Sequence, residues 1–212
     1  MFKRNQVEEA IARVLEPGSA KPSSAMRTRL RRLLETDRAL GRSKRSPDPE
    51  RANFAFSGME APGRGLENWF TGYEAFALMT GLRLMRDGWP QGLVVAVLRR
   101  VKPHLERHHA RILSQNRPVL FDANRTRQQA RPGDLAASNA DPVFLAIKSK
   151  AREDDAGASP AAICQGQEEL MGFIKTGGPG QTWIVTELGT LIPALSLALA
   201  KTVPRKRGQG SQ

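Results

Sequence analysis

Residues 73–98 form the most strongly patterned stretch of this chain. Over its first half, apolar residues occur on nearly every side of a helix: Tyr73, Phe76, Ala77, Leu78, Met79, Leu82, Leu84 and Met85. A helix that is apolar all round is typically buried in a core. Gly88 predicts the end of this helix, and Pro90 suits the first turn of the next one. The sequence therefore predicts two consecutive core helices, with Leu82 and Leu98 fully buried.

The second core helix continues into a basic region. We expect Pro103 to break it near Lys102, because proline lacks the N–H that a helix interior needs. Glu106 is the only acid that offsets the bases of this region: Arg99, Arg100, Lys102, Arg107, Arg111 and Arg117. Three histidines follow Pro103 at positions 104, 108 and 109, and we interpret them as imidazoles that supplement a basic surface.

The excess of positive charge is large and lies in the first two thirds of the chain. The 212 residues carry a formal net charge of +12. Residues 141–212 hold eight Lys or Arg and seven Asp or Glu, so residues 1–140 carry +11 of that total. Such a charge predicts a polyanionic partner, and nucleic acid or an anionic membrane surface are the two candidates.

The most informative helix is predicted over residues 25–40. One apolar stripe contains Met26, Leu30, Leu33, Leu34 and Leu40. Arginines occupy the rest of its circumference, with Arg27, Arg31 and Arg38 clustered and Arg32 and Arg29 further round. Only Glu35 and Asp37 offset these five arginines. A solvated charged face is one reading, and a face that contacts phosphates or bases is the other, which we favour.

A basic loop and a predicted β-wing follow this helix. The loop carries Arg42, Lys44 and Arg45. Short alternating segments at 53–56 and 66–70 flank a Gly- and Pro-rich connection with Arg64 at its tip, which predicts a hairpin. The alternative is an irregular loop held to the core by its aromatic residues: Phe54, Phe56, Trp69 and Phe70.

The last third of the chain has the pattern of a small α/β module. Strands are predicted at 143–147, 161–164 and 183–185, and helices at 167–175 and 188–200. The fold class expected is α+β, a mainly helical winged helix-turn-helix-like domain followed by this module. The expected domains are a nucleic-acid-binding domain at 1–135 and an oligomerisation or partner-binding domain at 141–203. A linker lies around 130–140, and 204–212 is expected to be a disordered basic tail.

No catalytic, metal-binding or cofactor-binding pattern stands out. His104 and His108 share a helical face, but a helical zinc motif needs Glu directly after the first His. The Gly-rich segment at 177–180 has Gln181 where a phosphate-binding loop needs Lys. Cys164 lies in an apolar segment and is interpreted as a small core residue. We therefore expect no enzyme activity, no cofactor and no metal.

Residues 1–115 resemble the MerR-like winged helix-turn-helix family. The resemblance rests on Trp69-Phe70-Thr71-Gly72-Tyr73 and on the segment 82–90, Leu-Arg-Leu-Met-Arg-Asp-Gly-Trp-Pro, which leads into the apolar residues at 93–98. In that family, a wing ends near an aromatic residue and a Leu-rich helix ends in Gly-aromatic. The resemblance implies that residues 25–40 face the DNA groove and that Arg64 is a wing contact.

These observations together predict a DNA-binding protein that acts as a transcriptional regulator, with duplex DNA as the favoured nucleic acid and a homodimer left open. The expected nucleic-acid-binding residues are Arg27, Arg29, Arg31, Arg32, Arg38, Arg42, Lys44, Arg45 and Arg64. An RNA- or ribosome-associated protein and an adaptor for an acidic protein remain alternatives. The longest apolar run, 188–200, contains Pro193 and is shorter than the roughly 18–20 residues that a bilayer requires. We therefore expect no membrane span and a cytoplasmic location.

Overall fold

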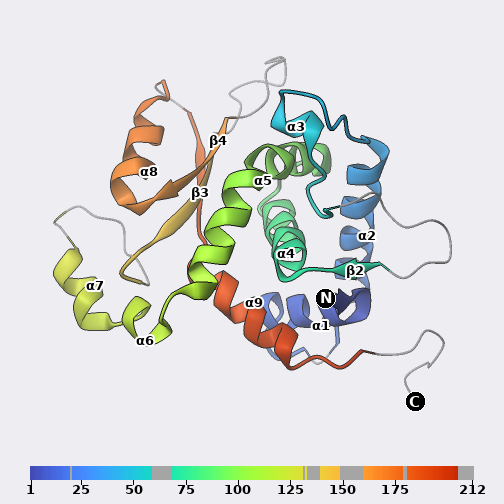
Figure 1. Ribbon diagram of the computed structural model, residues 1–212, viewed down its shortest axis with the longest axis horizontal. Coiled ribbons are helices and arrows are strands. Elements are labelled where there is room, and N and C mark those ends of the chain that lie inside the picture. Colours follow the sequence, from blue (N-terminus) through green and yellow to red (C-terminus); the bar gives the residue numbers. More distant parts are fainter. Residues whose placement is uncertain are drawn as a thin grey trace. The chain divides into compact units, whose positions relative to one another are not determined.

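The computed structural model describes residues 1–19, 21–58, 68–130, 132, 139–148, 160–178 and 181–204. The chain forms two compact units (Figure 1). The first consists of Met1–Arg99 and Ala194–Gln212, and the second of Arg100–Pro193. Along the chain, the units meet at residues 99/100 and 193/194, whereas the expected boundary between domains lay between residues 135 and 141. Each is described by itself below.

The first unit is built mainly from helices. They are α1 (Arg4–Leu15), α2 (Ser24–Ala39), α3 (Pro49–Ala52), α4 (Gly72–Arg86) and the beginning of α5 (Gln91–Ser114). Helix α4 is the core helix that the sequence predicts, and it contacts both α1 and α2. Leu82 and Leu98 are 2% and 0% exposed, which confirms their predicted burial. At Gly81, a Cβ atom would lie only 3.2 Å from Leu33 Cδ1 and 3.3 Å from Leu98 Cδ1. The absence of a side chain there lets the three helices pack closely.

Both ends of α4 follow from local sequence. Thr71 Oγ1 accepts a hydrogen bond from the Glu74 backbone N–H at 3.1 Å, and Glu74 Oε2 accepts one from the Thr71 N–H at 2.8 Å. This reciprocal pair satisfies two donors that a helix start would otherwise leave unpaired. At the other end, Gly88 adopts a φ of 90°, a backbone conformation that favours glycine. The predicted end of the first core helix is confirmed.

Helix α5 does not break at Pro103, and this prediction was wrong. The helix runs without interruption from Gln91 to Ser114 with Pro103 inside it. Proline in a helix interior costs about 3 kcal/mol. Buried side chains on both sides of Pro103, among them Leu98 and Leu105, are each 0% exposed. Burial of a leucine contributes about 1.5–3 kcal/mol, so continuing the helix through the proline is favoured.

The prediction of a hairpin between 53–56 and 66–70 was also wrong, since the described residues of these two segments do not pair with each other. Strand β2 (Trp69–Phe70) pairs antiparallel with β1 (Phe2–Lys3) from the start of the chain, and residues 53–56 form no strand. The backbone N–H groups of Ala55 and Phe56 donate instead to the Asp37 carboxylate, each at 3.1 Å. A helix side chain thus takes the place of a partner strand. Arg64 lies outside the described residues.

The alternative reading of this region agrees better with the structure. Phe54, Phe56 and Phe70 are 7%, 0% and 3% exposed, so these three rings do hold the segment to the core. Trp69 is the exception, with 47% of its surface exposed. Strand alternation explains the difference, because neighbouring residues of a strand point to opposite faces. Phe70 occupies the core side, so Trp69 faces outward.

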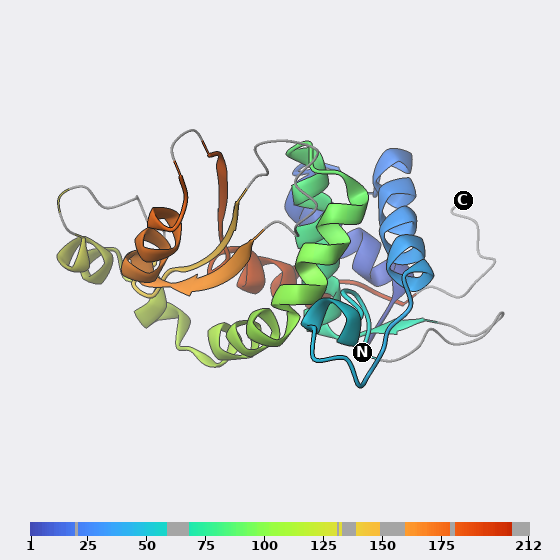
Figure 2. The same ribbon diagram turned by 90° about the horizontal axis from the view of Figure 1, so that it is seen from above.

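The second unit contains a three-stranded antiparallel sheet. Its strands are β3 (Val143–Lys148), β4 (Ala161–Gln165) and β5 (Trp183–Glu187), in the order β4-β3-β5. Helix α8 (Gly166–Lys175) packs on one face of the sheet (Figure 2). There Leu170 joins a buried cluster with Phe144, Ala146 and Cys164. Two short helices, α6 (Arg117–Leu120) and α7 (Ala123–Gln129), precede the sheet. Every strand and the helix predicted here are confirmed, and so is the α+β class.

The last helix, α9 (Leu191–Ala200), forms as expected but belongs to the first unit from Ala194 onward. Thr202, which follows this helix, is bonded to helix α1. Gln6 Nε2 donates to the Thr202 carbonyl and hydroxyl oxygens, each at 3.2 Å, and so connects α1 to the chain end of the same unit. The predicted tail lies outside the described residues except for Pro204, and most of the predicted linker lies outside them too. None of the described helices is long and apolar enough to span a bilayer.

Candidate nucleic-acid interface

Helix α2 is anchored by its apolar stripe and exposes its arginines. Ser23 Oγ accepts a hydrogen bond from the Met26 N–H at 3.2 Å and begins the helix. Met26, Leu30 and Leu33 are buried against the core. All five arginines are exposed: Arg27, Arg29, Arg31, Arg32 and Arg38. Helix α2 lies at the outer edge of the first unit in both Figure 1 and Figure 2.

We call Arg27, Arg31, Arg32 and Arg38 the arginine face. Its acidic neighbours are few and loosely engaged. Arg31 Nε lies 3.9 Å from Glu35 Oε1, and Arg27 Nε lies 3.7 Å from Glu8 Oε2 of helix α1. Arg32 and Arg38 form no ion pair with any described residue. The Arg31–Glu35 pair is exposed on both sides, and a pair of this kind contributes about 0–1 kcal/mol.

Asp37 does not neutralise the arginine face, although it belongs to the same helix. Its side chain is buried and bonded to the buried guanidinium of Arg99, with Arg99 Nε 2.6 Å from Asp37 Oδ1. Arg99 also donates through Nη2 to the Asp37 carbonyl oxygen and through Nη1 to the Gly41 carbonyl oxygen at 2.8 Å. This network fixes the C-terminal end of α2 and removes its second acid from the surface.

The basic loop after α2 divides into structural and exposed residues. Arg42 is partly buried, with its guanidinium carbon 5.1 Å from the centre of the Phe54 ring and Nη1 bonded to the Gly58 carbonyl oxygen at 3.3 Å. Arg42 therefore holds the loop against the core. Lys44 and Arg45 are exposed and have no hydrogen-bond or ion-pair partner among the described residues. These two side chains can extend the arginine face beyond the end of the helix.

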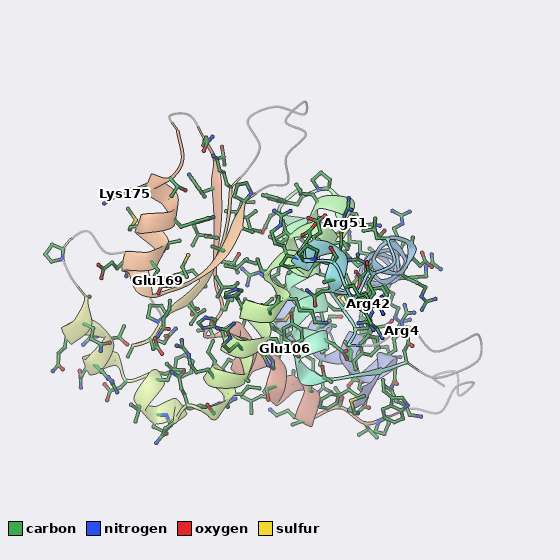
Figure 3. All side chains as sticks on the ribbon, turned by 45° about the horizontal axis from the view of Figure 1, so that its top comes forward. Arg4, Arg42, Arg51, Glu106, Glu169 and Lys175 are labelled. Atoms are coloured by element: carbon green, nitrogen blue, oxygen red, sulfur yellow. The ribbon has the colours of Figure 1, made fainter. Side chains whose placement is uncertain are left out.

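Three residues of the first unit were not predicted from the sequence as candidate interface residues: Lys3, Arg4 and Trp69. Lys3 Nζ lies 5.4 Å from the centre of the exposed Trp69 ring, and Arg4 Nε lies 2.7 Å from Glu8 Oε1. Figure 3 shows Arg4 and Arg42 in the first unit. In the sequence, the adjacent bases Lys3 and Arg4 were the only indication of this group. Their proximity to Trp69 could not be predicted, because the pairing of β1 with β2 joins segments more than 60 residues apart.

Two of the six bases expected to form a basic surface over Arg99–Arg117 are buried. Arg99 and Lys102 are 3% and 8% exposed, so neither can contact a polyanion. His109 is buried, and desolvation lowers its pKa to about 4, which leaves it neutral at pH 7. Burial and the neighbouring charges of Arg111 and Arg107 lower the pKa of His108 as well. The interpretation of the histidines as part of a basic surface was therefore wrong for buried His109, whereas His104 is exposed.

The second unit offers little for chemistry. Cys164 is buried, and desolvation followed by the Glu169 charge raises the pKa of its thiol, so the reactive thiolate is disfavoured. Within the described ranges, no group of three side chains could hold a metal ion. A pocket of about 430 Å³ lies beside Gln115, Asp141 and Gln165. Its carboxylate is already bonded to both amides, Gln115 Nε2 at 2.8 Å and Gln165 Nε2 at 3.2 Å.

Comparison with protein-family models, with curated proteins and with solved structures gives no match. The arginine face is thus the feature from which a function can be argued.

Proposed function

We propose that this protein binds nucleic acid through the arginine face of α2, with duplex DNA as its preferred target, and that it acts as a transcriptional regulator. The observation that carries the proposal is the charge imbalance on this helix. Four arginines point outward, while Asp37 is withdrawn into the core by Arg99. A solvated helix surface normally interleaves both signs of charge, whereas on α2 Glu35 is the only exposed acid beside five exposed arginines.

The shape of the surface favours duplex DNA. Helix α2 has 16 residues and is therefore about 24 Å long, and the major groove of B-DNA admits a helix. Arginine pairs with phosphate oxygens and with the O6 and N7 atoms of guanine through the same planar fork. The role given to α2 is the one that the resemblance to MerR-like winged helix-turn-helix proteins implies for residues 25–40. The proposal does not depend on a wing.

The test compares two triple variants that remove the same charge. Arg27, Arg31 and Arg38 are replaced by Ala in one, and Arg107, Arg125 and Arg127 of the second unit in the other. All six side chains are exposed. Duplex affinity is measured by fluorescence anisotropy at several salt concentrations. Each lost phosphate contact lowers the slope of log K against log salt by about 0.9. We expect the slope of the first variant to fall by about 0.9 for each of the three arginines that contacts a phosphate, and the slope of the second variant to stay unchanged.

Equal losses in the two variants would mean that net charge alone attracts DNA, and the proposal would then be wrong. The same titration with structured RNA and with an acidic protein separates the remaining partners. Tighter binding of RNA, or binding of the acidic protein alone, would also reject duplex DNA as the target.

A further inference from the structure

Trp69 has an unusual position for a large aromatic residue. Of the aromatic residues, all of which the structure describes, it is the only exposed one, with 47% of its surface accessible. Trp89 and Trp183 are partly buried, and the other rings are buried or partly buried. The exposed part of an indole is flat apolar surface in contact with water. A planar ligand that stacks on this surface displaces the water. Its environment indicates which ligand.

The surroundings of the ring are positively charged. Lys3 is the cross-strand partner of Trp69 in the β1–β2 pair, and its ammonium group lies over the ring, 5.4 Å from the centre. Arg4 follows Lys3 at the start of α1. A ligand that stacks on this indole therefore has cations beside it, and a negatively charged ligand is favoured over a neutral one.

A series of neighbouring charged residues leads from this ring to the arginine face. Glu8 has one oxygen 2.7 Å from Arg4 Nε and the other 3.7 Å from Arg27 Nε. The two guanidinium groups therefore lie on either side of one carboxylate, and Arg27 belongs to the arginine face. A polyanion bound along α2 at Arg27 meets Arg4 across Glu8, and Arg4 directly follows Lys3, the cross-strand partner of Trp69.

We propose that Trp69 and Lys3 form a stacking site for an unpaired nucleobase at the edge of the nucleic acid bound by the arginine face. The inference rests on the proposed function and adds to it the kind of nucleic acid that binds best. Every base has a flat face, so aromatic stacking is tolerant of sequence, while the adjacent phosphates pair with cations such as Lys3 and Arg4. The preferred target is then a duplex next to a single strand, rather than a blunt duplex.

The experiment measures the affinity of the full chain for a blunt duplex and for the same duplex with a five-thymine overhang. We expect the wild type to bind the overhang form at least about fivefold more tightly, the lower end of what stacking one base contributes. Trp69→Ala should abolish this preference and leave blunt-duplex affinity within twofold. Trp69→Phe, which keeps a ring, should restore most of it. Leu113→Ala removes another exposed apolar side chain, in the second unit, and should change neither affinity.

A spectroscopic readout reports stacking directly. In a variant carrying Trp89→Phe and Trp183→Phe, Trp69 is the remaining tryptophan. Its fluorescence should be quenched by the overhang duplex and little affected by the blunt one. An RNA version of the overhang that binds more tightly would assign the base to RNA and keep the stacking site.

Two results would overturn the inference and leave the proposed function intact: an equal affinity of the wild type for blunt and overhang duplexes, or a Trp69→Ala variant that keeps the overhang preference. Absence of binding to any duplex would instead reject the proposed function, and the stacking site with it. The triple replacement of Arg27, Arg31 and Arg38 tests the proposed function separately from the stacking site, since it should weaken binding of the blunt and the overhang duplex alike.

Discussion

Asp37 and Arg99 form a buried ion pair whose side chains are 5% and 3% exposed, with Arg99 Nε 2.6 Å from Asp37 Oδ1. By sequence, Asp37 offsets the arginines of one helix and Arg99 adds to a second basic region. In the fold the two charges neutralise each other. The pair also arranges its surroundings, because the Asp37 carboxylate accepts the N–H groups of Ala55 and Phe56 while Arg99 donates to the Gly41 carbonyl.

Removing the charge of Asp37 should destabilise the protein strongly. Asp37→Asn leaves the Arg99 guanidinium buried without a counter-charge, and breaking such a pair costs about 3–5 kcal/mol of unfolding free energy. Urea denaturation measures the change. Glu35→Gln on the same helix is the matched control, because Glu35 is 64% exposed and 3.9 Å from its arginine. We expect that variant to stay within about 0.5 kcal/mol. A loss below 1 kcal/mol for Asp37→Asn would contradict the importance of the pair.

The core helix α4 should be sensitive to cavity formation. Leu82→Ala is expected to lower the unfolding free energy by about 2–5 kcal/mol, from lost burial and from the cavity left behind. Leu113→Ala, at a side chain that is 42% exposed, should cost much less. Thermal and urea unfolding of both variants measure the difference. Similar losses for both would show that α4 is not the centre of the core.

Stability should depend on pH through His109. Its pKa is lowered from 6.5 to about 4 by burial, so the unfolded chain binds a proton more readily than the folded one. The contribution of neutral His109 is therefore complete above about pH 6.5 and falls as the pH drops toward 4. Between pH 7 and pH 5 the loss should be about 2 kcal/mol.

The measurement is the difference in unfolding free energy between wild type and His109→Gln across that range, which removes the contribution of other titrating groups. If wild type and His109→Gln show parallel pH profiles, the neutral buried imidazole is excluded.

The arginines of α2 should differ in what they contact if the helix enters a groove. Replacing a base-contacting member of Arg27, Arg31 and Arg38 should cost about 1–3 kcal/mol of binding free energy and relax preference at one position. Replacing a phosphate-contacting member should weaken all sequences alike and reduce the salt slope by about one. Single Arg→Ala variants are compared on selected and scrambled duplexes. Equal effects on every duplex would indicate nonspecific binding and reject a regulator.

Local patterns were sufficient to predict most of the elements. The all-round apolar pattern of residues 73–85 indicated a buried helix, and Gly88 indicated its end. The strands at 143–147, 161–164 and 183–185 were also found from short apolar runs. In each case the determinant lies within a few residues of its effect, in side-chain periodicity, capping or backbone preference. Such information is contained in the sequence itself.

The errors concern contacts between distant residues. Pairing of Trp69–Phe70 with Phe2–Lys3, rather than with 53–56, depends on a carboxylate from α2 that occupies the N–H groups of Ala55 and Phe56. Continuation of α5 through Pro103 depends on what the flanking leucines bury against. The charge of a residue is likewise known from sequence, but its exposure is not. The sequence by itself determined that α2 is rich in arginine, and only the tertiary structure decided that Asp37 and Arg99 leave the surface together, because burying either charge alone would cost too much.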